Sequence, residues 1–171
     1  MILVAELFKL TDQDSDAVRG GHLSHKTTKV KNKLVKKKEV KVLIKYKCLH
    51  HVSLTVTDLE RAKEFYGKTL CLKEIERPNF DFPGAWYEIE GHQLHLIVDP
   101  TSQTIRKDKR LSSREGHFAL RVENYHDTLK WLKQKAVEIL EKPYGKSGFA
   151  QIFCADPDGN LIELNVNQQN L

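Results

Sequence analysis

Four residues of the types that bind divalent metals lie in short apolar segments of this chain. They are His51 in HVSLTV, His95 in LHLIV, His117 in HFALRV and Glu163 in LIELNV. Imidazole nitrogens and carboxylate oxygens bind Zn, Ni, Co, Mn and Fe(II), and four such ligands leave two positions of an octahedron open. A substrate with two adjacent oxygens would fit there, and the ion would polarise its carbonyl as a Lewis acid. The sequence therefore predicts a divalent metal site with these four ligands.

Glu163 is the only carboxylate among the four candidates, which gives it a second expected role. Proton transfer needs a general base within reach of the substrate, and a carboxylate can serve. We expect Glu163 to be catalytic as that base, with a metal-bound hydroxide as the alternative.

Each of the four segments alternates apolar and polar residues, as a half-buried strand does. In the first segment Val52, Leu54 and Val56 share one face and His51 lies on the other. The same parity separates the other three candidate ligands from their apolar neighbours. All four are therefore expected on polar strand faces, free to meet in a cleft.

Residues 48–99 predict the order strand, helix and three strands. Thr57 followed by Glu60 is a capping-box pattern, and an apolar stripe from Leu59 to Leu70 has helical spacing. Three strands are expected near 72–77, 84–89 and 93–98, separated by turn residues.

The same order returns after a charged linker at 101–116. Asn124 can cap a helix, and strands follow near 137–141, 149–154 and 161–166. The apolar face of this helix is expected to comprise Tyr125, Leu129, Leu132 and Ala136. The ligand pairs have similar separations, 44 residues from His51 to His95 and 46 from His117 to Glu163. The chain thus predicts an α+β fold of two βαβββ modules, at 48–99 and 116–166.

Three segments of the chain resemble one known family. They are HHVSLTVTDLERAKEFYGKTLCL, GHFALRVEN and FCADPDGNLIEL. Their order around two βαβββ units is similar to the vicinal oxygen chelate superfamily, which includes glyoxalase I, bleomycin and fosfomycin resistance proteins and extradiol dioxygenases. The resemblance covers about 48–166 and implies a curved mixed sheet around a metal cleft.

The resemblance also assigns metal ligands. The family's first-strand histidine falls on His51, its second-module histidine on His117 and its last-strand glutamate on Glu163. The fourth ligand of glyoxalase I is a Glu or Gln near the end of the fourth strand, where this chain has His95. The segments RPNFDFPGAW and GHQLHLI are more similar to glyoxalase-like proteins of plants and bacteria.

Three function classes follow from the resemblance. We favour a metal-dependent lyase or isomerase of glyoxalase I type, acting on a small α-oxo or vicinal-oxygen substrate. One alternative is an extradiol-type dioxygenase, in which His51, His117 and Glu163 hold Fe(II). The other is a small-molecule binding protein of bleomycin-resistance type that needs no metal. No cluster matches the family's glutathione contacts.

A homodimer is expected because each half-cup of a βαβββ module leaves sheet and cleft surface uncovered. In glyoxalase I-like relatives the cleft ligands can come from two subunits. The resemblance therefore leaves two arrangements open, a metal site within one chain and a metal site between two chains.

Positive charge is concentrated in residues 1–47, which hold twelve Lys/Arg against five Asp/Glu. From residue 48 onward the balance is sixteen against eighteen, so we expect no nucleic-acid binding by the folded domain. We interpret 1–47 as a basic leader, either disordered or a non-native upstream extension, and 167–171 as a C-terminal tail. No apolar run is long enough to span a membrane, and the three scattered cysteines predict no disulfide framework. A cytoplasmic location is expected.

Overall fold

The computed structural model describes residues 44–103 and 108–171. The compact unit that contains both modules spans Tyr46–Leu171. The interpretation of 1–47 as a leader falls almost wholly outside the described residues. Within the described ranges no helix is long and apolar enough to cross a membrane. Cys48, Cys71 and Cys154 are free thiols.

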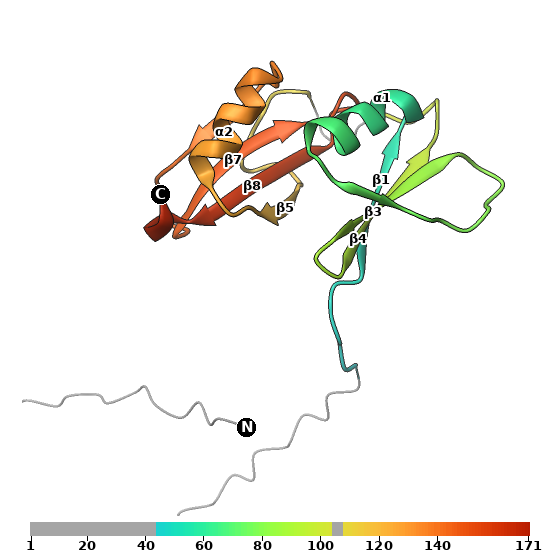
Figure 1. The fold of residues 1–171 in the computed structure, drawn as a ribbon, viewed down its shortest axis with the longest axis horizontal. Helices are drawn as coiled ribbons and strands as arrows, with labels where there is room; N and C mark the ends of the chain where they lie inside the picture. The colour runs from blue at the N-terminus through green and yellow to red at the C-terminus, as the bar shows by residue number, and fades with distance from the viewer. Residues whose placement is uncertain (1–43, 104–107) are drawn as a thin grey trace, which may run out of the picture. The chain divides into compact units, whose positions relative to one another are not determined.

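Module 1, residues 48–99, forms one four-stranded mixed sheet in the order β1-β4-β3-β2 (Figure 1). β1 pairs with β4 in parallel, and the other two pairs are antiparallel. Its elements are β1 (His51–Val56), α1 (Leu59–Lys63), the π-helical segment η1 (Glu64–Thr69), β2 (Lys73–Ile75), β3 (Gly84–Ile89) and β4 (His92–Val98).

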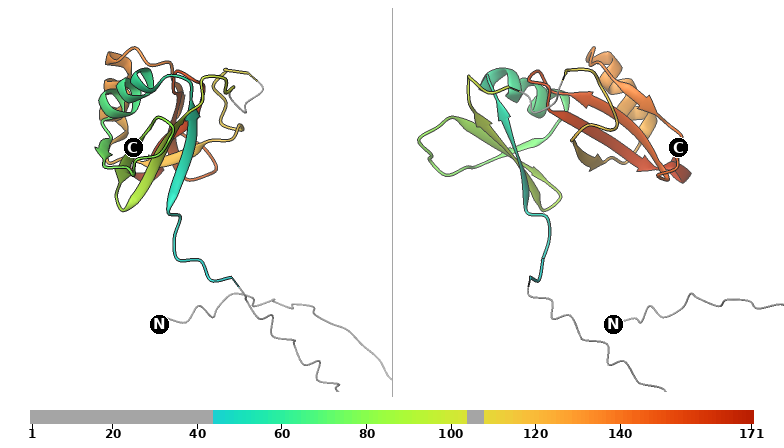
Figure 2. Two further views of the ribbon diagram at one scale, coloured as in Figure 1. Left: turned by 90° about the vertical axis from the view of Figure 1, so that its right-hand side faces the viewer. Right: turned by 180° about the vertical axis from the view of Figure 1, so that it is seen from behind.

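Module 2, residues 116–166, repeats this topology in the order β5-β8-β7-β6, again with its first and last strands parallel. Its elements are β5 (Phe118–Arg121), α2 (Tyr125–Gln134), β6 (Leu140–Lys142), β7 (Phe149–Ala155) and β8 (Leu161–Asn167), followed by the 3-10 turn η2 (Gln168–Asn170). The α+β fold of two βαβββ modules is confirmed. The two sheets are separate in the strand pairing, and α2 lies across one face of β7 and β8 (Figures 1 and 2).

Position in the sheet decides how deeply each candidate ligand is buried. β1 and β5 are edge strands, whereas β4 and β8 have a partner on both sides. Accordingly His51 is exposed on β1, while His95 on β4 and Glu163 on β8 are 8% and 5% exposed. A polar-face residue on a central strand is thus covered by its neighbours, which sequence parity alone does not predict.

Two local expectations are wrong at helix ends. The N-cap of α1 is Asp58, whose carboxylate accepts from the Arg61 backbone N–H. The Thr57 hydroxyl instead donates to Asp158. Ala136 is exposed, lies beyond the end of α2 and has a φ of 54°, so it does not extend the apolar face. The cap at Asn124 is confirmed, because its side chain accepts from the Asp127 N–H.

The core lies between the sheets and the helices that cover them. Its largest fully buried side chains are Tyr66, Tyr87, Phe153, Leu94, Leu96, Leu132, Ile152, Ile162, Val56, Val166 and Cys154. The set draws on both modules and on the strands that flank each candidate ligand. Buried side chains therefore hold in place the strands that carry the candidate ligands.

Candidate metal centre

His117 and Glu163 meet across the parallel strand pair of module 2. His117 immediately precedes β5, and Glu163 lies on β8 opposite Ala119. The His117 Nε2 atom is 3.2 Å from Glu163 Oε2, and the two side chains are 24% and 6% exposed. The sequence-predicted ligands of module 2 are therefore in direct contact.

A backbone contact fixes the tautomer of the His117 ring. Its Nδ1 atom is 2.7 Å from the Glu115 carbonyl oxygen. A carbonyl only accepts, so Nδ1 carries the proton and Nε2 of the neutral ring is a lone pair. That lone pair faces a carboxylate oxygen, and two acceptors at this distance repel each other unless a proton or a cation lies between them. Neighbouring ligand atoms on one divalent ion are about 3 Å apart, so the pair fits a metal ion.

Two amide side chains hold the Glu163 carboxylate. Gln151 Nε2 donates to Oε2 at 2.7 Å, and Asn165 Nδ2 donates to Oε1 at 2.6 Å. Outer partners of this kind orient a ligand carboxylate. Neither Gln151 nor Asn165 is among the candidates predicted from the sequence. The signal was strand parity: Asn165 shares the face of Glu163, and Gln151 lies opposite Asn165 in the β7–β8 register.

His51 and His95 meet in the same way in module 1. Their rings are stacked with centroids 4.3 Å apart and planes inclined by 14°. Trp86 stacks on His95 at 4.0 Å and 6°. Because β4 lies between β1 and β3, His95 is held between His51 and Trp86.

The stacked pair presents a different geometry to a metal. An imidazole binds through an in-plane lone pair, and two nearly parallel rings do not direct their lone pairs to one point, so chelation by both requires one ring to turn. His95 Nε2 is 2.8 Å from Gln93 Oε1 and donates to it, which leaves Nδ1 as the free acceptor. Burial, with His51 and His50 nearby, lowers the pKa of His95 and favours its neutral form. Neutral imidazole is the form that binds metal.

The two pairs do not join within one chain. In the part of the chain that the structure describes, no group of three or more His, Cys, Asp or Glu could hold a metal ion. His51 and His117 both line a cavity of about 800 Å³. Its other walls are largely apolar and include Val52, Leu54, Leu94, Phe118, Leu120 and Leu161. A single copy thus presents two separate pairs of candidate ligands, each a candidate half-site.

The sequence and the fold place the chain in a known family. The profile of the Glyoxalase/Bleomycin resistance protein/Dioxygenase superfamily matches residues 48–164, and the chain belongs to this superfamily. The expected resemblance to vicinal oxygen chelate proteins is confirmed.

Curated relatives carry glyoxalase names. Over 119 residues the chain is 28% identical to Glyoxylase I 4 of Arabidopsis thaliana, with 68% of each chain covered. It is 27% identical over 121 residues to lactoylglutathione lyase of Shigella flexneri, with 68% of this chain and 90% of the relative covered. Similarity at this level supports an enzyme of the superfamily without naming its reaction.

Solved structures show the same fold. One is a mutant of FosX, a genomically encoded fosfomycin resistance protein of Listeria monocytogenes, complexed with Mn(II) and 1S,2S-dihydroxypropylphosphonic acid. It superimposes with a TM-score of 0.59 at 19% identity, covering 74% of this chain and 98% of that one. At this identity the likeness extends to the fold alone.

Proposed function

We propose that this chain is a metal-dependent enzyme of glyoxalase I type, a lyase or isomerase acting on a small α-oxo or vicinal-oxygen substrate. The observation that carries the proposal is the contact between His117 Nε2 and Glu163 Oε2, which lie 3.2 Å apart. Two amide donors hold the buried Glu163 carboxylate in place, as outer partners hold a ligand carboxylate in a metal site. The names of the curated relatives agree with this class.

His51, His95, His117 and Glu163 would hold the ion, and this donor set suits Zn, Ni, Co, Mn or Fe(II). When bound, the ion would supply Lewis-acid polarisation of a substrate carbonyl. Glu163 is the one carboxylate of the set and would move the substrate proton as general base. Its amide partners would keep the carboxylate oriented while it does so.

We propose that each complete site forms between two copies of the chain, with His51 and His95 from one and His117 and Glu163 from the other. Two ligands are too few for a catalytic divalent ion, which takes three or more from protein. A two-fold dimer converts four half-sites into two whole sites. Among the residues that the structure describes, β1 and β5 are edge strands, and the apolar cavity beside them would be covered by the second copy.

Metal analysis and turnover test the enzyme proposal together. Purified protein should contain a stoichiometric divalent ion. Reconstitution with Ni, Co or Zn should give thioester absorbance when methylglyoxal and glutathione are added, the pair suggested by relatives named lactoylglutathione lyase. If no ion is bound and His117→Ala changes neither metal content nor ligand binding, the metal-free binding role replaces this proposal.

One observation favours a second candidate, an extradiol-type dioxygenase. His95 is stacked against Trp86 and its Nε2 donates to Gln93 Oε1, which in this candidate makes it a positioning neighbour of His51. The remaining set, His51, His117 and Glu163, is the two-histidine, one-carboxylate set of Fe(II) oxygenases. Oxygen uptake with catechols after ferrous reconstitution, retained in His95→Gln, would favour this candidate over the first.

A further inference from the structure

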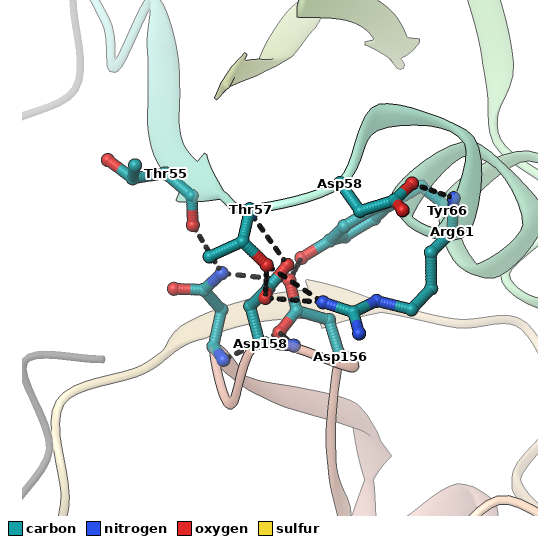
Figure 3. A network of polar contacts seen from close by, with 8 residues as sticks. Thr55, Thr57, Asp58, Arg61, Tyr66, Asp156 and Asp158 are labelled. Atoms are coloured by element: carbon teal, nitrogen blue, oxygen red, sulfur yellow. Dashed lines mark hydrogen bonds and ion pairs between the residues drawn. The ribbon is translucent and has the colours of Figure 1, made fainter. Parts of the chain in front are cut away.

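The β7–β8 turn of module 2 is shaped by Asp156 (Figure 3). Its Oδ1 accepts from the backbone N–H groups of Asp158 at 3.0 Å and Asn160 at 2.7 Å. Its Oδ2 accepts from Asn160 Nδ2 and from the Tyr66 hydroxyl, each at 2.8 Å. Tyr66 belongs to module 1, so one buried carboxylate both closes the turn and reaches the other module.

Asp158 accepts three hydrogen bonds from module 1. Its Oδ2 accepts from the Thr57 backbone N–H at 3.1 Å, and its Oδ1 accepts from Thr57 Oγ1 at 2.5 Å and Arg61 Nη2 at 2.8 Å. Arg61 also donates to Thr57 Oγ1 at 2.8 Å. The Asp158 side chain is 11% exposed and that of Arg61 is 49% exposed, so solvent screens the ion pair more than the bonds from Thr57.

The junction adjoins the strands that carry candidate ligands from both modules. Thr57 follows the end of β1, the strand that carries His51. Asn160 precedes β8, which carries Glu163, and its Nδ2 donates to the Thr55 carbonyl at 3.1 Å. A change of angle at this junction would therefore move one half-site of the chain relative to the other.

The junction is not a requirement of the βαβββ unit itself. In module 1 the equivalent β3–β4 turn closes on its own strand, where the Gly91 N–H donates to Glu88 Oε1. A separate link between the modules, from Trp131 Nε1 to the Thr69 carbonyl at 2.7 Å, does not involve Asp158. The modules would thus stay attached when the Asp158 contacts are removed.

We propose that Asp158, Thr57 and Arg61 are positioning residues that fix the angle between the two half-sites of one chain. This inference rests on the proposed function. In a two-fold dimer each copy contributes to two metal sites, so both sites close correctly only when every chain holds its half-sites at one fixed orientation. The three residues act on the metal through that orientation and do not touch it.

Co(II) binding to the full chain tests this proposal. Asp158→Ala should raise the dissociation constant for Co(II) about tenfold, the low end of what outer positioning groups contribute, and should alter the Co(II) absorption spectrum. Thr57→Val should act in the same direction, and Thr57→Ser, which keeps the hydroxyl, should restore wild-type binding. If Asp158→Ala does not fold, the comparison of Thr57→Val with Thr57→Ser tests the positioning role.

Asp58→Ala is the matched control. It removes the N-cap of the same helix without touching Asp158, so it should lower Tm and leave the Co(II) affinity and spectrum unchanged. Wild-type affinity and spectrum in folded Asp158→Ala and Thr57→Val would overturn the positioning role. Absence of Co(II) binding by the wild-type chain would instead overturn the proposed function, and this inference with it.

Discussion

His117, just before the edge strand β5, contacts Glu163 on the neighbouring interior strand β8, and its Nε2 lies 3.2 Å from Oε2. The Glu115 carbonyl orders the ring by accepting from Nδ1, and two amides order the carboxylate. Both partners are thus fixed with their acceptors facing each other. With a neutral ring, this arrangement is costly unless a proton or a cation lies between the two acceptors.

Replacing the buried carboxylate should remove the metal without unfolding the domain. Glu163→Gln keeps the size of the side chain but replaces an anionic ligand with a neutral amide, so we expect metal affinity to fall by more than about 100-fold, beyond the cost of losing an outer partner. Isothermal titration with Zn or Co measures this. Glu138→Gln, an exposed change in module 2, is the control. Unchanged affinity in Glu163→Gln would exclude Glu163 as a ligand.

Removing one amide support should have a smaller effect on the same property. Gln151→Ala deletes the donor to Glu163 Oε2, and outer partners of metal ligands contribute about 10- to 100-fold in affinity. We expect a loss in that range, measured by competition with a chelator. Gln134→Ala, at the exposed end of α2, should bind as the wild type does. Equal affinity in the two variants would show that Gln151 does not orient the ligand.

Mild acid should destabilise the metal-free protein through His95. Burial and the neighbouring His51 and His50 lower its pKa in the folded state, so the unfolded chain binds the proton more readily. This contribution to stability is intact above the unfolded pKa of about 6.5 and is lost as pH falls through the lowered folded value. Urea unfolding in chelator at several pH values should show a shallower decline below about pH 6.5 in His95→Gln. The same decline in that variant as in the wild type would contradict this cause. His126→Gln controls for the loss of a histidine.

Sequence pattern predicted the order of the strands and helices well. The alternation around His51 and the repeat of strand–helix–strand order carry the module topology, because local periodicity and an internal repeat are properties of the sequence itself. The bounds of β3, Gly84–Ile89, match the prediction to the residue. Pattern also places Glu163 on the polar face of its strand.

The relations between elements could not be predicted in the same way. Thr57 looks like a helix cap in sequence, but its hydroxyl bonds Asp158, 101 residues away, and Asp58 caps the helix instead. The burial of His95 depends on the order of strands in the sheet, and its stacking depends on Trp86 across a strand pair. Long-range packing decides these features, and no local spacing encodes it.

A mixing experiment tests the central claim, that the metal site is shared between two copies. One variant carries His51→Ala and His95→Ala, and the other carries His117→Ala and Glu163→Ala. Neither variant alone should bind metal with wild-type affinity. Unfolded together and refolded, they should recover about a quarter of the wild-type metal content, because half of the dimers would then be mixed and each would contain one intact site of two. Recovery at that level supports a shared site. No recovery, with mixed dimers present, would contradict it.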